Sequence, residues 1–275
     1  MSAVAASGSP YAAAHRRRYQ KAKALSWDPA AFGLEQDKAD WAGFSDEERD
    51  AALRACALFL GGEEAVAGDL APLLVRLRKE PGQEAACAFL ASQLWEEAKH
   101  AELFDRWITE VAGAPDLAPY ASEPHAGLFE KRLPDALDRL LTDPSDEALV
   151  RAVATYHVLI EGTLAEAGYH GFYTCFKQND VLPGLVAGIE HVQRDEARHI
   201  AFGIDLLRER FARDPALSEI LEEEAEATFD LVVGILADYF APYGGAENPF
   251  GLRADDIMLF AGNQLGKRMR TMNRA

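Results

Sequence analysis

The stretches WEEAKH (95–100) and RDEARH (194–199) share one pattern, a Glu followed three positions later by a His. The pairs are Glu97 with His100 and Glu196 with His199. On a helix, residues three apart lie on the same face, so both side chains of a pair can reach one metal ion. Two such turns, each preceded by a helix that carries one more Glu, form the ligand set of a di-metal carboxylate site in a four-helix bundle.

The two further carboxylates lie upstream at matching distances. Glu63 precedes the Glu of the first motif by 34 residues, and Glu161 precedes the Glu of the second by 35 residues. Of the seven histidines, only His100 and His199 have a Glu three positions earlier. A single Glu-x-x-His is weak evidence in an acidic helical protein, but a matched pair with near-equal spacing rarely arises by chance. The sequence therefore predicts six metal ligands from four helices.

Each of three predicted ligands has a second carboxylate nearby that competes for the same role: Glu63 with Glu64, Glu97 with Glu96, and Glu161 with Glu166. The spacing of three to the following His selects Glu97, and we expect Glu96 to be solvated or to support a ligand. Glu166 lies more than one turn after Glu161 and is predicted to lie at the surface. Spacing alone leaves Glu63 and Glu64 open.

The ligand set also limits the metal. Four carboxylates supply four negative charges and two divalent ions four positive ones, so the buried site is neutral in its reduced form. Oxygen ligands with one His per ion suit iron and manganese, whereas zinc usually takes fewer ligands in a tetrahedral site. Asp195 and Arg198 flank the second motif. One of them could orient a ligand His by a hydrogen bond, or the two could form a surface ion pair.

Composition excludes several classes of function. The net charge of −17 argues against nucleic acid as a partner and against a polybasic membrane anchor. No apolar run reaches membrane-spanning length, and no apolar segment follows the basic cluster His15–Arg18, so no secretory signal is expected. The three cysteines, Cys56, Cys87 and Cys175, have no framework spacing and predict reduced thiols in a cytoplasmic protein.

The pattern along the chain predicts an all-α protein. We expect a flexible N-terminal arm at 1–25 and a single helical domain at 26–275, which opens with an extended stretch from Trp27 to Phe44. Ser45 and Glu48 form a capping box that begins the first bundle helix, interrupted only at Gly61-Gly62. The four bundle helices are predicted near residues 45–74, 83–112, 146–177 and 184–211. Flanking helices are predicted near 127–141, 216–242 and 253–272, with a proline-containing loop at 113–126.

Four segments carry a family resemblance: GEEAV (62–66), EEAKHAE (96–102), TYHVLIEGT (155–163) and RDEARH (194–199). With them the chain resembles the ferritin-like superfamily of di-metal carboxylate proteins. More narrowly, it resembles the ligand-binding oxidases related to the small subunit of ribonucleotide reductase. The likeness extends from about Trp27 to the C-terminal helices.

The resemblance implies a mixed site with one manganese and one iron, although two irons would suit the same ligands. It implies that Glu63, rather than Glu64, holds the manganese together with Glu97 and His100. Glu161, Glu196 and His199 would then hold the iron, with Glu97 bridging the two ions.

The resemblance also implies an activity. Reaction of the reduced metals with dioxygen would form an ether cross-link between Val66 and Tyr156. Val66 lies three residues after Glu63 and faces the metals. Tyr156 lies five before Glu161, a spacing that does not by itself place both on one face. The family further implies a long-chain fatty-acid-like ligand and, as is common in the superfamily, a homodimer.

Three alternatives stay open. The first is a radical-generating reductase subunit. Its radical Tyr would stand four residues after the first His, where this chain has Phe104, and the end of the chain (267–275) offers no Tyr for radical transfer. The second is a di-iron hydroxylase, N-oxygenase or desaturase on the same scaffold. The third is a non-enzymatic iron-binding or storage bundle.

Overall fold

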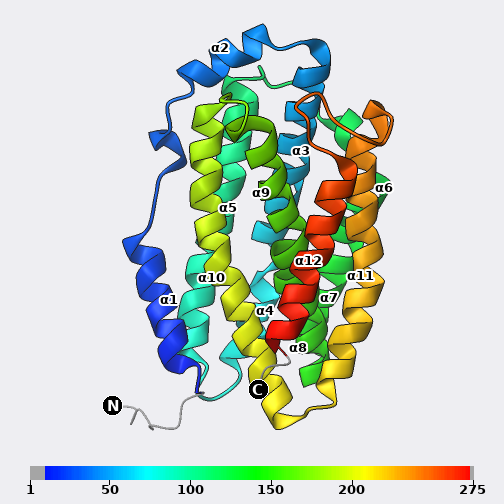
Figure 1. The fold of residues 1–275 in the computed structure, drawn as a ribbon. Coiled ribbons are helices and arrows are strands. Elements are labelled where there is room, and N and C mark those ends of the chain that lie inside the picture. The colour runs from blue at the N-terminus through cyan, green and yellow to red at the C-terminus, as the bar shows by residue number, and fades with distance from the viewer. Residues whose placement is uncertain (1–9, 273–275) are drawn as a thin grey trace.

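The computed structural model describes residues 10–272, and helices of different lengths make up nearly all of this part of the chain (Figure 1). Within it there is no β-strand, and only an isolated bridge joins Glu247 to Arg253. The elements in chain order are α1 (Ala12–Ala24), η1 (Pro29–Ala31), α2 (Glu35–Gly43), α3 (Asp46–Asp69), α4 (Ala71–Arg78), α5 (Glu84–Glu110), η2 (Ala118–Tyr120), α6 (Glu123–Ala126), η3 (Gly127–Arg132), α7 (Leu133–Thr142), α8 (Asp146–Val153), η4 (Ala154–Ala165), α9 (Glu166–Phe172), η5 (Tyr173–Lys177), α10 (Pro183–Arg213), α11 (Leu217–Phe240), η6 (Ala241–Tyr243) and α12 (Ala254–Met272).

Four long helices form the bundle, as the sequence predicted. They are α3, α5, the continuous helix 146–177 and α10. The predicted capping box is confirmed, since Ser45 Oγ accepts from the backbone N–H of Glu48, whose carboxylate accepts from the N–H of Ser45. Ser145 caps the third bundle helix through a single hydrogen bond, which its Oγ accepts from the N–H of Ala148. These caps satisfy backbone donors that have no partner inside the helix and so fix where each helix begins.

The third bundle helix is not uniformly α-helical. Residues 154–165 (η4) and 173–177 (η5) are π-helical, with backbone hydrogen bonds from residue i to i+5. Thr163 Oγ1 also donates to the carbonyl of Val158, five residues earlier, at 2.8 Å. A π-helix has more residues per turn than an α-helix, so it changes which side chains share a face. This change matters because Tyr156 and Glu161 both lie in η4.

Gly61 and Gly62 do not interrupt α3, contrary to the sequence prediction. They let two rings approach its backbone. A Cβ at residue 61 would lie 3.2 Å from Cε1 of His125, and a Cβ at residue 62 would lie 3.2 Å from Cζ of Phe129. The glycines therefore offset their poor helix propensity by allowing α6 and η3 to pack closely against α3.

The predicted arm and extended stretch need correction. Residues 12–24 form helix α1, and residues 35–43 form helix α2; residues 1–9 of the arm lie outside the described residues. Figure 1 shows α1 running beside α5 and α10. His15 is fully buried against Phe202, and Arg18 forms an ion pair of 2.6 Å with Asp205. The basic residues suggested a solvated arm because the sequence does not show that α10 carries a matching carboxylate.

Other boundaries differ in detail. The first bundle helix ends at Asp69, and a separate helix, α4, follows it with Pro72 in its first turn. Helices α11 and α12 pack on η4, on the side of the molecule opposite α1 (Figure 1). None of the helices in residues 10–272 is both long and apolar enough to cross a membrane. The flanking helices α11 and α12 thus cover the outer side of the third bundle helix.

Candidate metal centre

The bundle brings all six predicted ligand side chains together in its interior. Glu63 comes from α3, Glu97 and His100 from α5, Glu161 from η4, and Glu196 and His199 from α10. Each is buried, with an exposed fraction of 7% or less. Glu64, the rival of Glu63, is exposed to solvent. The choice that spacing left open therefore falls to Glu63, because only its side chain enters the bundle.

The six side chains form two groups that share members. One group is Glu63, Glu97, His100 and Glu196; the other is Glu97, Glu161, Glu196 and His199. In each group one ligand atom per residue lies within 4.8 Å of all the others, a size that suits one metal ion. Glu97 belongs to both groups, as a bridging ligand would. Glu196 belongs to both as well, which the sequence did not indicate.

Both histidines turn Nδ1 toward the carboxylates. Nδ1 of His100 lies 3.2 Å from Glu196 and 3.4 Å from Glu97. Nδ1 of His199 lies 3.0 Å from Glu97 and 3.4 Å from Glu161. Neither Nδ1 forms a hydrogen bond of normal geometry, although both are fully buried. Buried polar atoms without partners are rare in proteins, and here they point at a common centre with oxygen donors, as metal ligands do.

The electrostatics of the cluster also favour cations. Burial raises the pKa of Glu63 to about 8, and burial together with the charge of Glu196 raises the pKa of Glu161. Burial alone would lower the pKa values of His100 and His199, but the surrounding carboxylates raise both. Several ligands thus hold protons when no metal is bound. Two divalent ions can replace those protons and keep the buried site neutral.

A second set of groups orients the ligand histidines. Nε2 of His199 donates to Glu96 at 2.9 Å, and Nε2 of His100 lies 3.5 Å from Asp195. Arg198 contacts both carboxylates, at 2.6 Å to Glu96 and 2.7 Å to Asp195. Glu96 and Asp195 are fully buried. The supporting role predicted for Glu96 is confirmed by its hydrogen bond to His199. Asp195 instead forms the predicted ion pair with Arg198, in the interior rather than at the surface. Carboxylate partners of this kind fix the tautomer and direction of a ligand imidazole.

Trp27 and Lys99 complete this arrangement, and no sequence pattern indicated either residue. Nε1 of Trp27 donates to Asp195 at 2.7 Å, and Nζ of Lys99 donates to the same oxygen at 3.3 Å. The Trp27 ring also stacks on His100, with centroids 6.1 Å apart. Although burial opposes it, the hydrogen bonds and charges of His100 and Arg198 hold the pKa of Asp195 well below its usual range. Asp195 therefore stays ionised beside His100.

The comparisons with known proteins agree with this geometry. The family model described as "Ribonucleotide reductase, small chain" matches residues 13–273, nearly the whole chain. The chain belongs to the ribonucleotide reductase small chain family. The fold is accordingly the ferritin-like bundle that the sequence predicted.

Several solved structures of one kind of family member are very similar to this chain. An R2-like ligand-binding oxidase with aerobically reconstituted Mn/Fe cofactor after a long soak is 32% identical, with a TM-score of 0.90, and the match covers 96% of this chain and 94% of that one. An R2-like ligand-binding oxidase with aerobically reconstituted metal cofactor after photoconversion is 32% identical, with a TM-score of 0.89, and the match covers 95% of this chain and 94% of that one. A valine-to-isoleucine variant of an R2-like ligand-binding oxidase with anaerobically reconstituted Mn/Fe cofactor is 33% identical, with a TM-score of 0.88, and the match covers 95% of this chain and 94% of that one.

In the present chain, Tyr156 contacts the ligand cluster directly. Its hydroxyl donates to Oε1 of Glu97 at 2.7 Å and accepts from Nε2 of Gln93 at 3.1 Å. Nε2 of Gln93 also lies 3.0 Å from Oε1 of Glu161. Five residues of α-helix would turn Tyr156 away from Glu161, but the π-helical geometry of η4 brings both to the same side. Gln93 carries no sequence signal, because only the fold places it between these two residues.

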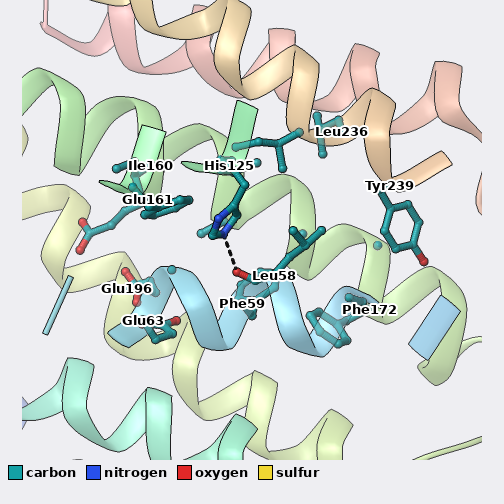
Figure 2. Close-up of a pocket in the computed structure, with 18 of the residues that line it drawn as sticks. Leu58, Phe59, Glu63, His125, Ile160, Glu161, Phe172, Glu196, Leu236 and Tyr239 are labelled. Atoms are coloured by element: carbon teal, nitrogen blue, oxygen red, sulfur yellow. Dashed lines mark hydrogen bonds between the residues drawn. The ribbon is translucent and has the colours of Figure 1, made fainter. Parts of the chain in front are cut away.

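An apolar cavity opens from the cluster. Its lining includes Glu63, Glu97, Glu161 and Glu196 together with Val66 and Tyr156. Figure 2 shows Glu63, Glu161 and Glu196 gathered at one end, with Tyr239 and Phe172 at the other. The walls between the two ends are mostly apolar side chains: Ala55, Leu58, Phe59, Phe129, Ile160, Leu164, Phe172, Phe176, Ile235, Leu236, Leu252 and Ile257. Such a cavity suits a long apolar ligand whose polar group faces the carboxylates.

Proposed function

We propose that this protein is a dioxygen-activating oxidase with a dinuclear manganese–iron site. The observation that carries the proposal is the pair of overlapping ligand groups, whose buried Nδ1 atoms have no other partner. The Mn/Fe cofactor of the similar R2-like ligand-binding oxidases supports the choice of metals. Glu63, Glu97 and His100 would hold one ion and Glu161, Glu196 and His199 the other, with Glu97 shared.

The cofactor would supply electrons to dioxygen and the oxidising power to remove hydrogen from an unactivated C–H bond. The chain's own residues prepare that chemistry. Glu96 holds the imidazole of His199 in a fixed direction, and Asp195 places a negative charge beside that of His100. The helices that enclose the site exclude bulk water, which strengthens every electrostatic interaction within it.

We infer that the internal product of this chemistry is an ether between Val66 and Tyr156. Both side chains line the cavity, and the Tyr156 hydroxyl donates a hydrogen bond to Glu97. In the reaction, a C–O bond between a side-chain carbon of Val66 and the Tyr156 oxygen replaces one C–H and one O–H bond. The two protons and two electrons that are released are taken up by dioxygen.

We further infer that the cavity binds a long-chain fatty-acid-like ligand with its carboxylate at the metals. The apolar walls support this inference, since burial of methylene groups provides about 0.8 kcal/mol each. A homodimer and a cytoplasmic location remain predictions from the sequence. The mass of the protein in solution tests the former and also the storage alternative, because storage proteins usually assemble as large shells.

The decisive experiment is intact mass measurement after metal loading with and without air. We expect a loss of two hydrogens only after aerobic loading, mapped to a peptide pair that contains Val66 and Tyr156. A Tyr156→Phe protein is the matched control, since it should bind the same metals without the mass change. An unchanged mass in both loadings would contradict the cross-link and favour a reductase subunit or an iron-binding bundle. Product analysis with a labelled ligand separates the oxidase from a hydroxylase or N-oxygenase.

A further inference from the structure

One polar side chain lies part-way along the otherwise apolar cavity. Figure 2 shows His125 between the carboxylates at one end and Tyr239 at the other. Tyr239 and Cys175 also line the cavity beyond the cluster, and the polar atom of each has a partner. Asn248 donates to the Tyr239 hydroxyl at 2.9 Å and to Sγ of Cys175 at 3.2 Å. His125 therefore differs from them in offering an atom that the protein does not already use.

The imidazole of His125 is held in a fixed orientation. Its Nε2 lies 3.2 Å from the carbonyl oxygen of Leu58 on α3. The ring packs over Gly61, where any side chain would crowd it, and against Phe129 at a centroid distance of 4.6 Å. A ring restrained on three sides presents its remaining edge in one direction and loses little freedom when a ligand binds.

The hydrogen bond to Leu58 also fixes the tautomer. A carbonyl oxygen only accepts, so Nε2 must carry the hydrogen. Burial lowers the pKa of His125, so the ring is neutral at physiological pH, and Nδ1 is then an acceptor. Among the described residues, none donates a hydrogen bond to Nδ1. His125, which lines the cavity, thus offers a hydrogen-bond acceptor that has no donor, and an alkyl chain alone supplies none.

We propose that His125 accepts a hydrogen bond from a hydroxyl group in the middle of the ligand chain, so that the cavity selects one positional isomer among long-chain hydroxy acids. This inference rests on the proposed function, in which the ligand carboxylate lies at the metals. The His125 ring docks on α3 at Leu58, five residues before Glu63, which corresponds to about 7 Å along a helix. The hydroxyl would therefore lie several carbons from the carboxylate.

The physical consequence is selectivity among positional isomers. A hydroxyl that reaches Nδ1 of His125 exchanges a hydrogen bond to water for one to the protein. A hydroxyl elsewhere is buried against apolar walls without a partner, and its desolvation weakens binding by about tenfold or more. An unsubstituted acid avoids both effects. We therefore expect the matched isomer to bind about as well as the unsubstituted acid and all other isomers to bind more weakly.

The test is a titration of metal-loaded, ligand-stripped protein with stearic acid and a positional series of monohydroxystearic acids, followed by calorimetry. Wild type should bind one isomer, or two adjacent ones, about tenfold more tightly than the rest. In His125→Leu that advantage should disappear while stearic acid still binds. His125→Gln, which keeps an acceptor on a flexible side chain, should restore part of it.

The outcomes separate this inference from the function beneath it. If stearic acid binds but wild type shows no preferred isomer, or if His125→Leu keeps the same preference, the role of His125 is wrong and the fatty-acid site stands. If no acid binds to wild type, both proposals fail. Metal content and melting temperature serve as controls: a purely structural role for His125 would lower the melting temperature of His125→Leu and leave the isomer ratios unchanged.

Discussion

Gly203→Ala tests whether the bundle is packed as closely as the structure indicates. Gly203 lies on α10, four residues after His199, and faces the fully buried ring of His157 on η4. A Cβ at residue 203 would lie 2.2 Å from Cβ of His157 and 2.4 Å from its Cγ. Non-bonded carbons normally keep about 3.5–4.0 Å apart, so the two helices would have to separate by more than about 1 Å.

The expected cost follows from two opposing effects. Overpacking of a rigid core contact destabilises a protein by about 1–3 kcal/mol, and this contact is at the upper end because Cβ of His157 sits at the backbone and cannot rotate away. Alanine returns about 1 kcal/mol through its better helix propensity. We expect a net loss of about 2 kcal/mol, which corresponds to a fall in melting temperature of about 4–8 °C for a chain of this size.

Thermal unfolding followed by circular dichroism measures this effect, and Gly262→Ala is the matched control. Gly262 lies in α12, is exposed and has no atom within 4 Å of where its Cβ would be. There, alanine should raise the melting temperature slightly, because it gains helix propensity without a clash. If Gly203→Ala melts at or above the wild-type temperature, α10 and η4 do not pack as closely as described. The positions of Gln93 and Tyr156 beside this contact would then be wrong as well.

Three further predictions concern the metal site and the fold. Metal affinity should increase from pH 6 to 8, by about tenfold per pH unit for each proton displaced. Burial raises the pKa of Glu63 to about 8 and also raises that of Glu161, so both carboxyl groups must lose protons to bind a metal. Competition with a chelator at several pH values measures the affinity, and a constant affinity would contradict the prediction. Glu96→Gln should weaken metal binding by about 10–100-fold, because His199 loses the charge that orients it; the same competition at one pH checks it against wild type, and unchanged affinity would rule out this support. Ser45→Ala should destabilise the protein by about 1 kcal/mol through loss of the capping box, without changing metal content. Unfolding in denaturant and a metal assay check this, and an unchanged free energy of unfolding or a loss of metal would contradict it.

Much of the site could be predicted from local spacing. A Glu and a His three residues apart must share a face on any helix, so the pairs at 97–100 and 196–199 carry their geometry within the sequence. The matching upstream carboxylates indicated two similar halves, and the capping box at Ser45 marked the first bundle helix. The choice of Glu63 over Glu64 needed a resemblance, because neighbouring residues differ only in the direction that they face.

Other predictions failed where the environment decides the outcome. Basic residues 16–18 suggested a solvated arm, yet α1 is a helix held by the buried His15 and by the ion pair of Arg18 with Asp205. Gly61-Gly62 suggested a break, yet α3 continues because His125 and Phe129 fill the space that side chains would occupy. In each case the partner lies far away in sequence, where local patterns carry no information.

Local sequence patterns are enough to predict a helical bundle with two Glu-x-x-His turns, because helix periodicity and capping act over a few residues. The packing of the helices places both Glu97 and Glu196 in the two ligand groups and surrounds them with Glu96, Asp195 and Gln93. It also turns Tyr156 toward Glu97, through a π-helical segment that spacing cannot show. Burial, ion pairing and the width of a helical turn depend on which surfaces pack together, and that is a property of the whole fold.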